Sequence, residues 1–193
     1  MKRHVVASIR MALFTLVVLG VAYPLAMTGI AQVLMPAQSN GSLVKSADGT
    51  VIGSSLIGQN FTAAKYFHGR PSAAGADGYD ASASGASNLS PTSKALVDSV
   101  TSRVASAVAE DPGLVAGKVP IDMVTASASG LDPDISIANA LAQVARVAAA
   151  RRMSADAVRS VVDAHITPRT LGLLGEPRVN VLELNLALDA LPK

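Results

Sequence analysis

The 193-residue chain contains no cysteine, which excludes disulfide bonds and thiolate metal sites. Tryptophan is also absent and aromatic residues make up only 3% of the chain, so any core must be built from valine, leucine, isoleucine and alanine. Charged residues make up only 16%, against 50% hydrophobic residues. This balance is too apolar for a disordered chain and indicates some membrane content.

Positive charge is concentrated at one end. Lys2, Arg3 and Arg10 lie within the first ten residues, which leaves 13 of the 16 Lys and Arg residues against 14 Asp and Glu residues elsewhere. This near balance provides no basic face for a nucleic-acid backbone, so nucleic acid is not an expected partner.

Sequence patterns for nucleotide hydrolysis are missing. The chain contains neither G-x-x-x-x-G-K-[ST] nor G-x-G-x-x-G, the loops that hold phosphates in common nucleotide-binding folds. The Asp-Lys-Thr-Gly motif of phosphorylated transport ATPases is absent too. We therefore do not expect the chain to hydrolyse ATP by itself.

A long apolar segment is present instead. Residues 11–35 carry no charge, and as a helix they would be about 37 Å long, more than the ~30 Å hydrocarbon layer of a bilayer. Because positive charge favours the cytoplasmic side, we predict a cytoplasmic N-terminus at 1–10, a transmembrane helix at 11–35 and an extracytoplasmic remainder. A cleaved signal peptide is the alternative, but its apolar region would be shorter and would end in an A-x-A-like site.

Small residues recur within this segment. Ala22, Ala26 and Gly29 lie on one helix face, and Pro24 is predicted to kink the helix. In lipid, such a stripe lets another helix approach closely. An anchor helix that is simply rich in small residues is an equally good interpretation.

The rest of the chain is predicted to be one α+β domain at 42–193, after a linker at 36–41. The turn sequence Ala47-Asp48-Gly49 lies between Ser42–Lys45 and Thr50–Ser54, a pattern typical of a hairpin. A small sheet is therefore expected near the start of the domain, followed by helices.

Helix-capping signals recur after the hairpin. Ser90 (followed by Pro91), Ser136 and Ser154 are suited to N-cap positions, and Asn180-Val-Leu-Glu183 fits a capping box. Helices are therefore predicted to start at these sites, the first ending near Glu110 before Asp111-Pro-Gly. Residues 181–191 also alternate as a strand would, but helix is favoured; Val119–Thr125 is predicted to be extended.

The stretch YFHGRPSA at 66–73 has the residue mix of an active site. A general base such as His68 needs a nucleophile and an orienting partner. Ser72 lies nearby, yet three members of a triad rarely come from one short stretch, and the chain contains no G-x-S-x-G elbow. We therefore expect no catalytic residue here and interpret His68 and Arg70 as docking-loop residues. The alternative is a membrane-anchored extracytoplasmic hydrolase or binding module centred on this pair.

Other polar residues sit singly beside glycine or proline. The histidines at 4, 68 and 165 lack metal-ligand spacing, and Asp132-Pro-Asp134 is ordinary turn and capping chemistry, so no metal is expected. Scattered rigid polar turns favour protein docking over catalysis. The candidate subunit-interface residues are His68, Arg70, Asn88, Asp132, Arg146, Glu176 and Arg178.

Several segments, in order, resemble the C-subunit family of the bacterial high-affinity potassium-transporting ATPase, the Kdp complex. They are the N-terminal anchor, LIGQNF (56–61), YFHGRPSA (66–73), SGASNLSPTS (84–93), VPIDMVTASASGLDPDIS (119–136), QVARVAAAR (143–151) and LGEPRVNVLELNLALD (174–189). The chain departs from the family pattern at Ala86, Ser90 and Ala128, where glycine is common, and at Asp134, where histidine is frequent.

The resemblance implies a single-span, non-catalytic subunit of the bacterial inner membrane. Its partners would be a channel-like potassium-translocating subunit, a P-type ATPase subunit, a small single-helix subunit and membrane lipid. It implies no stably bound cofactor, with ATP reached only through the complex. It further implies a catalytic chaperone that raises the pump subunit's affinity for ATP, with Gln143 in contact with the nucleotide.

The predicted topology conflicts with the last of these implications. Gln143 lies in the domain expected outside the cytoplasm, whereas ATP is hydrolysed inside. An alternative interpretation makes Gln143 and Arg146, three residues apart, an exposed docking pair on a helix.

Overall fold

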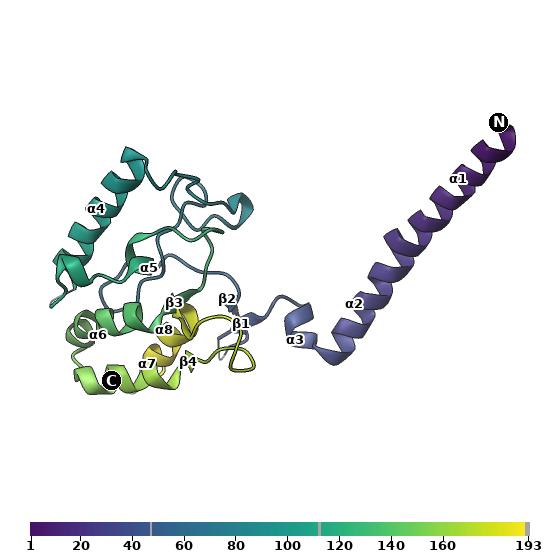
Figure 1. Ribbon diagram of the computed structural model, residues 1–193. Helices are drawn as coiled ribbons and strands as arrows, with labels where there is room; N and C mark the ends of the chain where they lie inside the picture. Colours follow the sequence, from purple (N-terminus) through teal and green to yellow (C-terminus); the bar gives the residue numbers. More distant parts are fainter. Residues whose placement is uncertain (47, 112, 192–193) are drawn as a thin grey trace. The chain divides into compact units, whose positions relative to one another are not determined.

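A computed structural model of the protein describes residues 1–46, 48–111 and 113–191. Ala47 of the predicted hairpin turn, Pro112 of the predicted helix stop and residues 192–193 lie outside the described residues. The chain divides into two units, an anchor unit (Met1–Ser54) and a C-terminal unit (Ser55–Lys193). Both helices and small antiparallel sheets are present (Figure 1), which confirms the α+β class.

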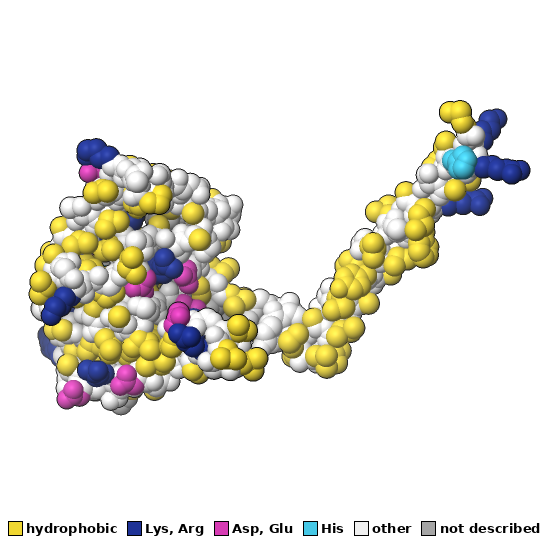
Figure 2. All heavy atoms as spheres, viewed as in Figure 1, with side chains coloured by type: hydrophobic (Ala, Val, Ile, Leu, Met, Phe, Trp, Pro, Cys, Tyr) yellow, Lys and Arg dark blue, Asp and Glu magenta, His cyan; other side chains and the backbone are white. Residues whose placement is uncertain are grey.

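The anchor unit begins with 33 consecutive helical residues. They form α1 (Lys2–Val17), the π-helical turn η1 (Val18–Ala22) and α2 (Tyr23–Leu34). By length and composition this helix can cross a membrane. Figure 2 shows it covered by hydrophobic side chains, with its Lys and Arg side chains gathered at the N-terminal end.

The helix is irregular just before Pro24. Proline has no N–H to donate to the preceding turn, and the π-helical turn Val18–Ala22 lies directly before α2. Ala22, Ala26 and Gly29 are all exposed, and a β-carbon added at Gly29 would meet nothing within 4 Å. The face therefore has room for another helix.

The anchor unit ends in the predicted hairpin. Residues 36–41, the predicted linker, include a short helix, α3 (Pro36–Ser39). Strands β1 (Leu43–Lys45) and β2 (Val51–Ser54) then pair antiparallel with an irregularity after Val44, which confirms the hairpin. The hairpin belongs to the anchor unit, and the C-terminal unit begins at Ser55.

The longer helices of the C-terminal unit start largely where capping residues predict. Ser136, Ser154 and Asn180 each accept a hydrogen bond from the N–H three residues later. They begin α6 (Ile137–Arg151), α7 (Ala155–Ala164) and α8 (Val181–Asp189), so residues 181–189 are a helix and not a strand. The extended prediction for Val119–Thr125 is wrong, since α5 (Ile121–Val124) occupies its centre.

Helix α4 (Lys94–Glu110) ends as predicted but starts three residues later than predicted. Ser90 lies in a turn, in which its carbonyl accepts from the Ser93 N–H at 2.9 Å, and Ser93 is the N-cap, accepting from Leu96 N–H at 3.2 Å. We expect Ser93→Ala to lower the free energy of unfolding by about 1 kcal/mol and Ser90→Ala to have a smaller effect. Urea titrations of the two variants measure this; a larger loss for Ser90→Ala would contradict the assignment.

A second sheet was not predicted. Strands β3 (Asp134–Ser136), β5 (Arg178–Asn180) and β4 (Ile166–Thr167) pair antiparallel in the order β3-β5-β4. Short 3-10 turns lie at η2 (Ala81–Ala83) and η3 (Ala116–Lys118). Strands of two or three residues are too short to show a period-2 pattern, so their sequence carries no strand signal.

The core lies between the small sheet and helices α6, α7 and α8 (Figure 1). It contains one aromatic side chain, Phe67, which comes from the YFHGRPSA stretch and not from a helix or strand. The other buried members are Ile135, Ala140, Val144, Val147, Ala148, Val158, Val162, Val179, Val181, Leu184 and Leu188. Phe67 therefore fixes one end of the candidate loop in the core.

Candidate functional site

Loop 66–73, the docking loop, is attached to the core at its first two residues. Phe67 is fully buried, and Tyr66 is half-buried with its hydroxyl donating to Asp189 Oδ2 at 2.9 Å. The Tyr66 ring also lies 5.4 Å from that of Phe61 and 5.2 Å from the Arg151 guanidinium. Both aromatic residues thus serve to hold the loop.

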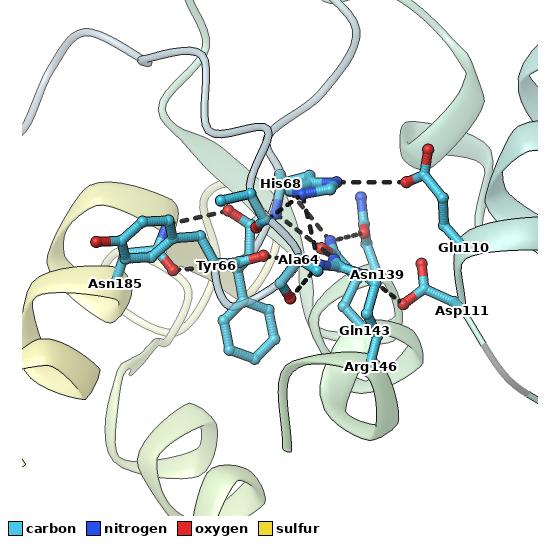
Figure 3. A network of polar contacts seen from close by, with 11 residues as sticks. Ala64, Tyr66, His68, Glu110, Asp111, Asn139, Gln143, Arg146 and Asn185 are labelled. Carbon is cyan, nitrogen blue, oxygen red and sulfur yellow. Dashed lines mark hydrogen bonds and ion pairs between the residues drawn. The ribbon is translucent and has the colours of Figure 1, made fainter. Parts of the chain in front are cut away.

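Two buried side-chain amides clamp successive residues of the loop backbone. Asn185 of α8 accepts from Phe67 N–H at 2.8 Å and donates to its carbonyl at 3.0 Å. Gln143 of α6 does the same to His68, at 2.7 Å and 3.1 Å. Figure 3 shows the two amides on either side of the loop. Each reproduces the paired hydrogen bonds that a neighbouring strand makes in an antiparallel β-ladder.

Gln143 has no hydrogen-bonding capacity left. Besides the two bonds to His68, its Oε1 accepts from Arg146 Nη2 at 2.6 Å and its Nε2 donates to Asn139 Oδ1 at 2.7 Å. An amide side chain offers two donors and two acceptor lone pairs, and all four are engaged. Only 1% of the residue is exposed.

Arg146 is buried beside Gln143 and forms an ion pair with Asp111 at 2.8 Å. Its Nη1 donates to the carbonyls of Ala64 and Tyr66 at 2.8 Å and 2.9 Å. Burial raises the pKa of the Asp111 carboxyl, and the adjacent guanidinium opposes that rise. The prediction of an exposed docking pair at Gln143 and Arg146 is therefore wrong: both side chains are buried, with Arg146 bound to the carbonyls before Phe67 and Gln143 bound to His68 after it.

His68 lies at the edge of this network. Its Nε2 is 3.4 Å from both the Ala63 carbonyl and Arg146 Nη1, and its Nδ1 is 3.7 Å from Glu110 Oε2. Burial, together with the positive charge of Arg146, lowers the pKa of His68 below its ordinary 6.5. The neutral imidazole is therefore the form that the fold favours.

This lowered pKa predicts a specific loss of stability in acid. A depressed pKa contributes stability above the unfolded value of 6.5, and that stability is lost as the pH falls through the folded value. The raised pKa of Asp111 acts in the opposite direction, since its contribution is lost as the pH rises. We expect His68→Gln to flatten the fall in melting temperature between pH 7 and pH 5. An unchanged pH profile in the variant would contradict this.

The second half of the docking loop is held through Ser72 and Tyr79. The Ser72 hydroxyl donates to Gly130 O at 2.6 Å and accepts from Tyr79 N–H at 2.7 Å. The Tyr79 hydroxyl donates to Arg70 O at 2.6 Å, and burial raises its pKa to about 12. A β-carbon at Gly69 would lie 2.5 Å from that hydroxyl, which explains the glycine. Ser72 thus stabilises backbone and is not presented as a nucleophile.

Arg70 is half-buried and connects the loop to the turn that follows α5. Its Nη1 is 3.0 Å from Asp132 Oδ2, and its Nη2 donates to the Ala126 carbonyl at 3.3 Å. The predicted interface residues Arg70 and Asp132 are therefore bound to each other. Their side chains are 26% and 29% exposed, so each keeps a surface for a neighbour.

A cavity of about 340 Å³ lies beside the docking loop. The structure brings three of the predicted site residues to its wall, namely His68, Arg70 and Gln143. The polar part of the lining also includes residues that were not predicted site residues: Asn60, Thr62, Ser72, Asp77, Tyr79, Arg103, Ser106, Glu110 and Asp111. Among the residues that the structure describes, no group of three His, Asp or Glu side chains could hold a metal ion.

The remaining predicted interface residues lie elsewhere. Asn88 is exposed in a turn with φ 51°. Glu176 pairs with Arg169 at 2.6 Å on the surface, and Arg178 of β5 pairs with Asp134 of β3 at 2.9 Å. These three positions do not join the docking loop in one site.

Comparison with known proteins identifies the family. The family model described as the c chain of K+-transporting ATPase, KdpC, matches residues 5–190. The chain belongs to the KdpC family. The resemblance read from the motifs is thereby confirmed over nearly the whole chain.

Individual KdpC relatives agree. The chain is 57% identical over 191 residues to the potassium-transporting ATPase KdpC subunit of Gemmatimonas aurantiaca, covering 99% of this chain and 94% of that protein. It is 59% identical over 170 residues to that of Nitratidesulfovibrio vulgaris (88% and 85%) and 55% over 184 residues to that of Caulobacter vibrioides (95% and 91%).

Proposed function

We propose that this KdpC-family chain is a non-catalytic, single-span accessory subunit of an ATP-driven potassium uptake complex in the bacterial inner membrane. Residues 11–35 span the bilayer, residues 1–10 are cytoplasmic, and the chain from residue 36 onward is extracytoplasmic. The N-terminal helix supports the span by length and composition, and Lys2, Arg3 and Arg10 support the orientation.

One observation carries the accessory role. The polar side chains around the docking loop are engaged in holding its backbone, as the double hydrogen bonds from Gln143 and Asn185 show. A nucleophile or general base has to be free to exchange a proton with substrate. A loop clamped in this way presents a fixed surface to a neighbour, so a hydrolase is not favoured.

Membership of the KdpC family supports a set of proposed partners. We propose contacts with a channel-like potassium-translocating subunit, a P-type ATPase subunit and a small single-helix subunit, together with membrane lipid. His68, Arg70 and Asp132 are the partly exposed polar groups that we propose for contacts at the docking loop. Ala22, Ala26 and Gly29 form the helix face that packs against a neighbouring span.

An effect on ATP affinity is the finer part of the proposal. Direct contact between Gln143 and a nucleotide would require the amide to give up at least one of its four hydrogen bonds, because all its donors and acceptors are engaged. We therefore propose that the chain raises the pump's ATP affinity through subunit contacts. On this account Arg70→Ala raises the pump's KM for ATP while the fold is unchanged, whereas Gln143→Ala also destabilises the fold.

Co-purification tests the proposal. A tagged full-length chain in mild detergent is expected to bring the pump and channel subunits with it, and Arg70→Ala is expected to reduce their yield. Lys94→Ala is the matched control, because it removes an exposed cation of a surface ion pair on α4. A chain that purifies without partners would contradict the proposal. Orientation is tested with a C-terminally fused reporter that works only in the cytoplasm. Activity of this reporter would overturn the proposed orientation.

A further inference from the structure

The connection between β4 and β5 exposes three leucines within four residues. Leu171, Leu173 and Leu174 are 88%, 81% and 63% exposed. The leucines of helix α8, in the same unit, are mostly buried. We call residues 170–174 the leucine tip; the loop that carries it projects from the end of β4 (Figure 1). Three exposed leucines within four residues are unusual on a surface that faces only water.

The backbone of the leucine tip holds these side chains outward. Leu171 has φ 55° and Gly172 has φ 74°. Glycine adopts the left-handed backbone conformation without strain. Leucine adopts it at a cost in free energy, because the leucine Cβ approaches the neighbouring carbonyl. A conformation of this kind persists where the surrounding structure imposes it, which marks the tip as a built feature.

Four N–H groups of the tip donate hydrogen bonds within residues 169–174. Thr170 and Leu174 exchange two hydrogen bonds at 2.9 Å and 3.0 Å, and the N–H groups of Gly172 and Leu173 donate to Arg169 O and Thr170 O at 3.0 Å and 3.2 Å. Backbone groups that are already paired can leave water at little cost, and this is the condition for entering an apolar phase. At the base of the tip, Arg169 and Glu176 form an exposed ion pair.

We propose that the leucine tip inserts into the extracytoplasmic interface of the bilayer, with Arg169 at the depth of anionic lipid headgroups. The inference rests on the proposed membrane span, which keeps a bilayer within reach of the C-terminal unit. Only 20 residues, from Met35 to Ser54, join the span to the C-terminal unit, and helix α3 and the β1–β2 hairpin shorten that connection, so the unit stays close to the bilayer. A convex tip needs no complementary pocket, and the lipid is present in every state of the protein.

Single-cysteine labelling tests this in the full-length chain, because the sequence contains no other cysteine. The environment-sensitive fluorophore NBD is attached at Leu173→Cys, and the protein is reconstituted into vesicles of phosphatidylethanolamine and phosphatidylglycerol, with and without doxyl-labelled lipid. Leu19→Cys reports on the span, and Val97→Cys, an exposed apolar position on α4, reports on the unit away from the tip.

We expect blue-shifted emission and doxyl quenching at 173 but neither at 97. Adding Leu171→Ser and Leu174→Ser to the Leu173→Cys chain is expected to abolish the quenching, which separates insertion of the tip from insertion of the dye. Equal emission at 173 and 97 would overturn the inference. Shielding at 173 that appears only with the partner subunits and without doxyl quenching would also overturn it, because the tip would then bind protein. Absence of doxyl quenching at Leu19→Cys would instead contradict the proposed membrane span. The label at Leu173→Cys tests insertion of the tip in a separate measurement.

Discussion

Replacing Arg146 with methionine is expected to lower the free energy of unfolding by about 3–5 kcal/mol. The Arg146 guanidinium is 6% exposed and is the ion-pair partner of a carboxylate, Asp111, that is itself buried. Its loss leaves that charge unpaired and releases the carbonyls of Ala64 and Tyr66. The effect is large because an unpaired buried charge costs more than the pair contributes.

Urea unfolding of the full-length chain in mild detergent, followed by far-UV circular dichroism, measures this loss. The double variant Asp111→Leu/Arg146→Met is expected to be more stable than Arg146→Met alone, since it removes both charges. Lys94→Ala breaks an exposed ion pair and is expected to cost less than about 1 kcal/mol. Similar losses for Arg146→Met and Lys94→Ala would show that Arg146 does not support the loop.

Replacing Asn185 with leucine is expected to lower the free energy of unfolding by about 2–5 kcal/mol, because it leaves two buried backbone groups of Phe67 unsatisfied. Leucine has a similar volume, so the loss isolates the hydrogen bonds at 2.8 Å and 3.0 Å. The docking loop loses one of its two amide clamps and keeps the other, from Gln143. The variant should therefore fold with a looser loop.

Hydrogen exchange of the segment around Phe67 measures the loosening directly. We expect faster exchange in Asn185→Leu than in the parent chain, together with a lower yield of co-purified partner subunits. Gln38→Leu, which replaces an exposed amide of α3, is the control and is expected to change stability by less than about 0.5 kcal/mol. Unchanged exchange at Phe67 would contradict the clamp.

Local signals account for the parts of the fold that the sequence predicted. The capping residues Ser136, Ser154 and Asn180 predict where their helices start, because a cap is a contact between near neighbours in the chain. The same rule misplaced the start of α4, since Ser90 and Ser93 are both good caps and only the structure shows which one bonds to the helix. Strands β3, β4 and β5 were not predicted, because their pairing joins separate segments of the chain and leaves no local signal.

The candidate site was predicted only in part for a similar reason. His68 and Arg70 stand out by residue type, and the structure places both beside the cavity. Nothing in the sequence shows that Asn185, 118 residues away from Phe67, binds its backbone. The burial of Gln143 and Arg146 had a weak signal, because with Asn139 they fall three or four residues apart on a helix otherwise rich in alanine and valine. That spacing marks one face, but it does not say whether the face is buried.

Reconstitution of ATP hydrolysis tests the accessory role most directly. The purified full-length chain is added to the channel, pump and small subunits prepared without it, and potassium-stimulated ATP hydrolysis is measured. The account predicts no hydrolysis by the chain alone and restored potassium-stimulated hydrolysis when it is added, with less restoration by Arg70→Ala than by Lys94→Ala. Hydrolysis by the chain alone, or equal activity of the complex with and without it, would contradict the account.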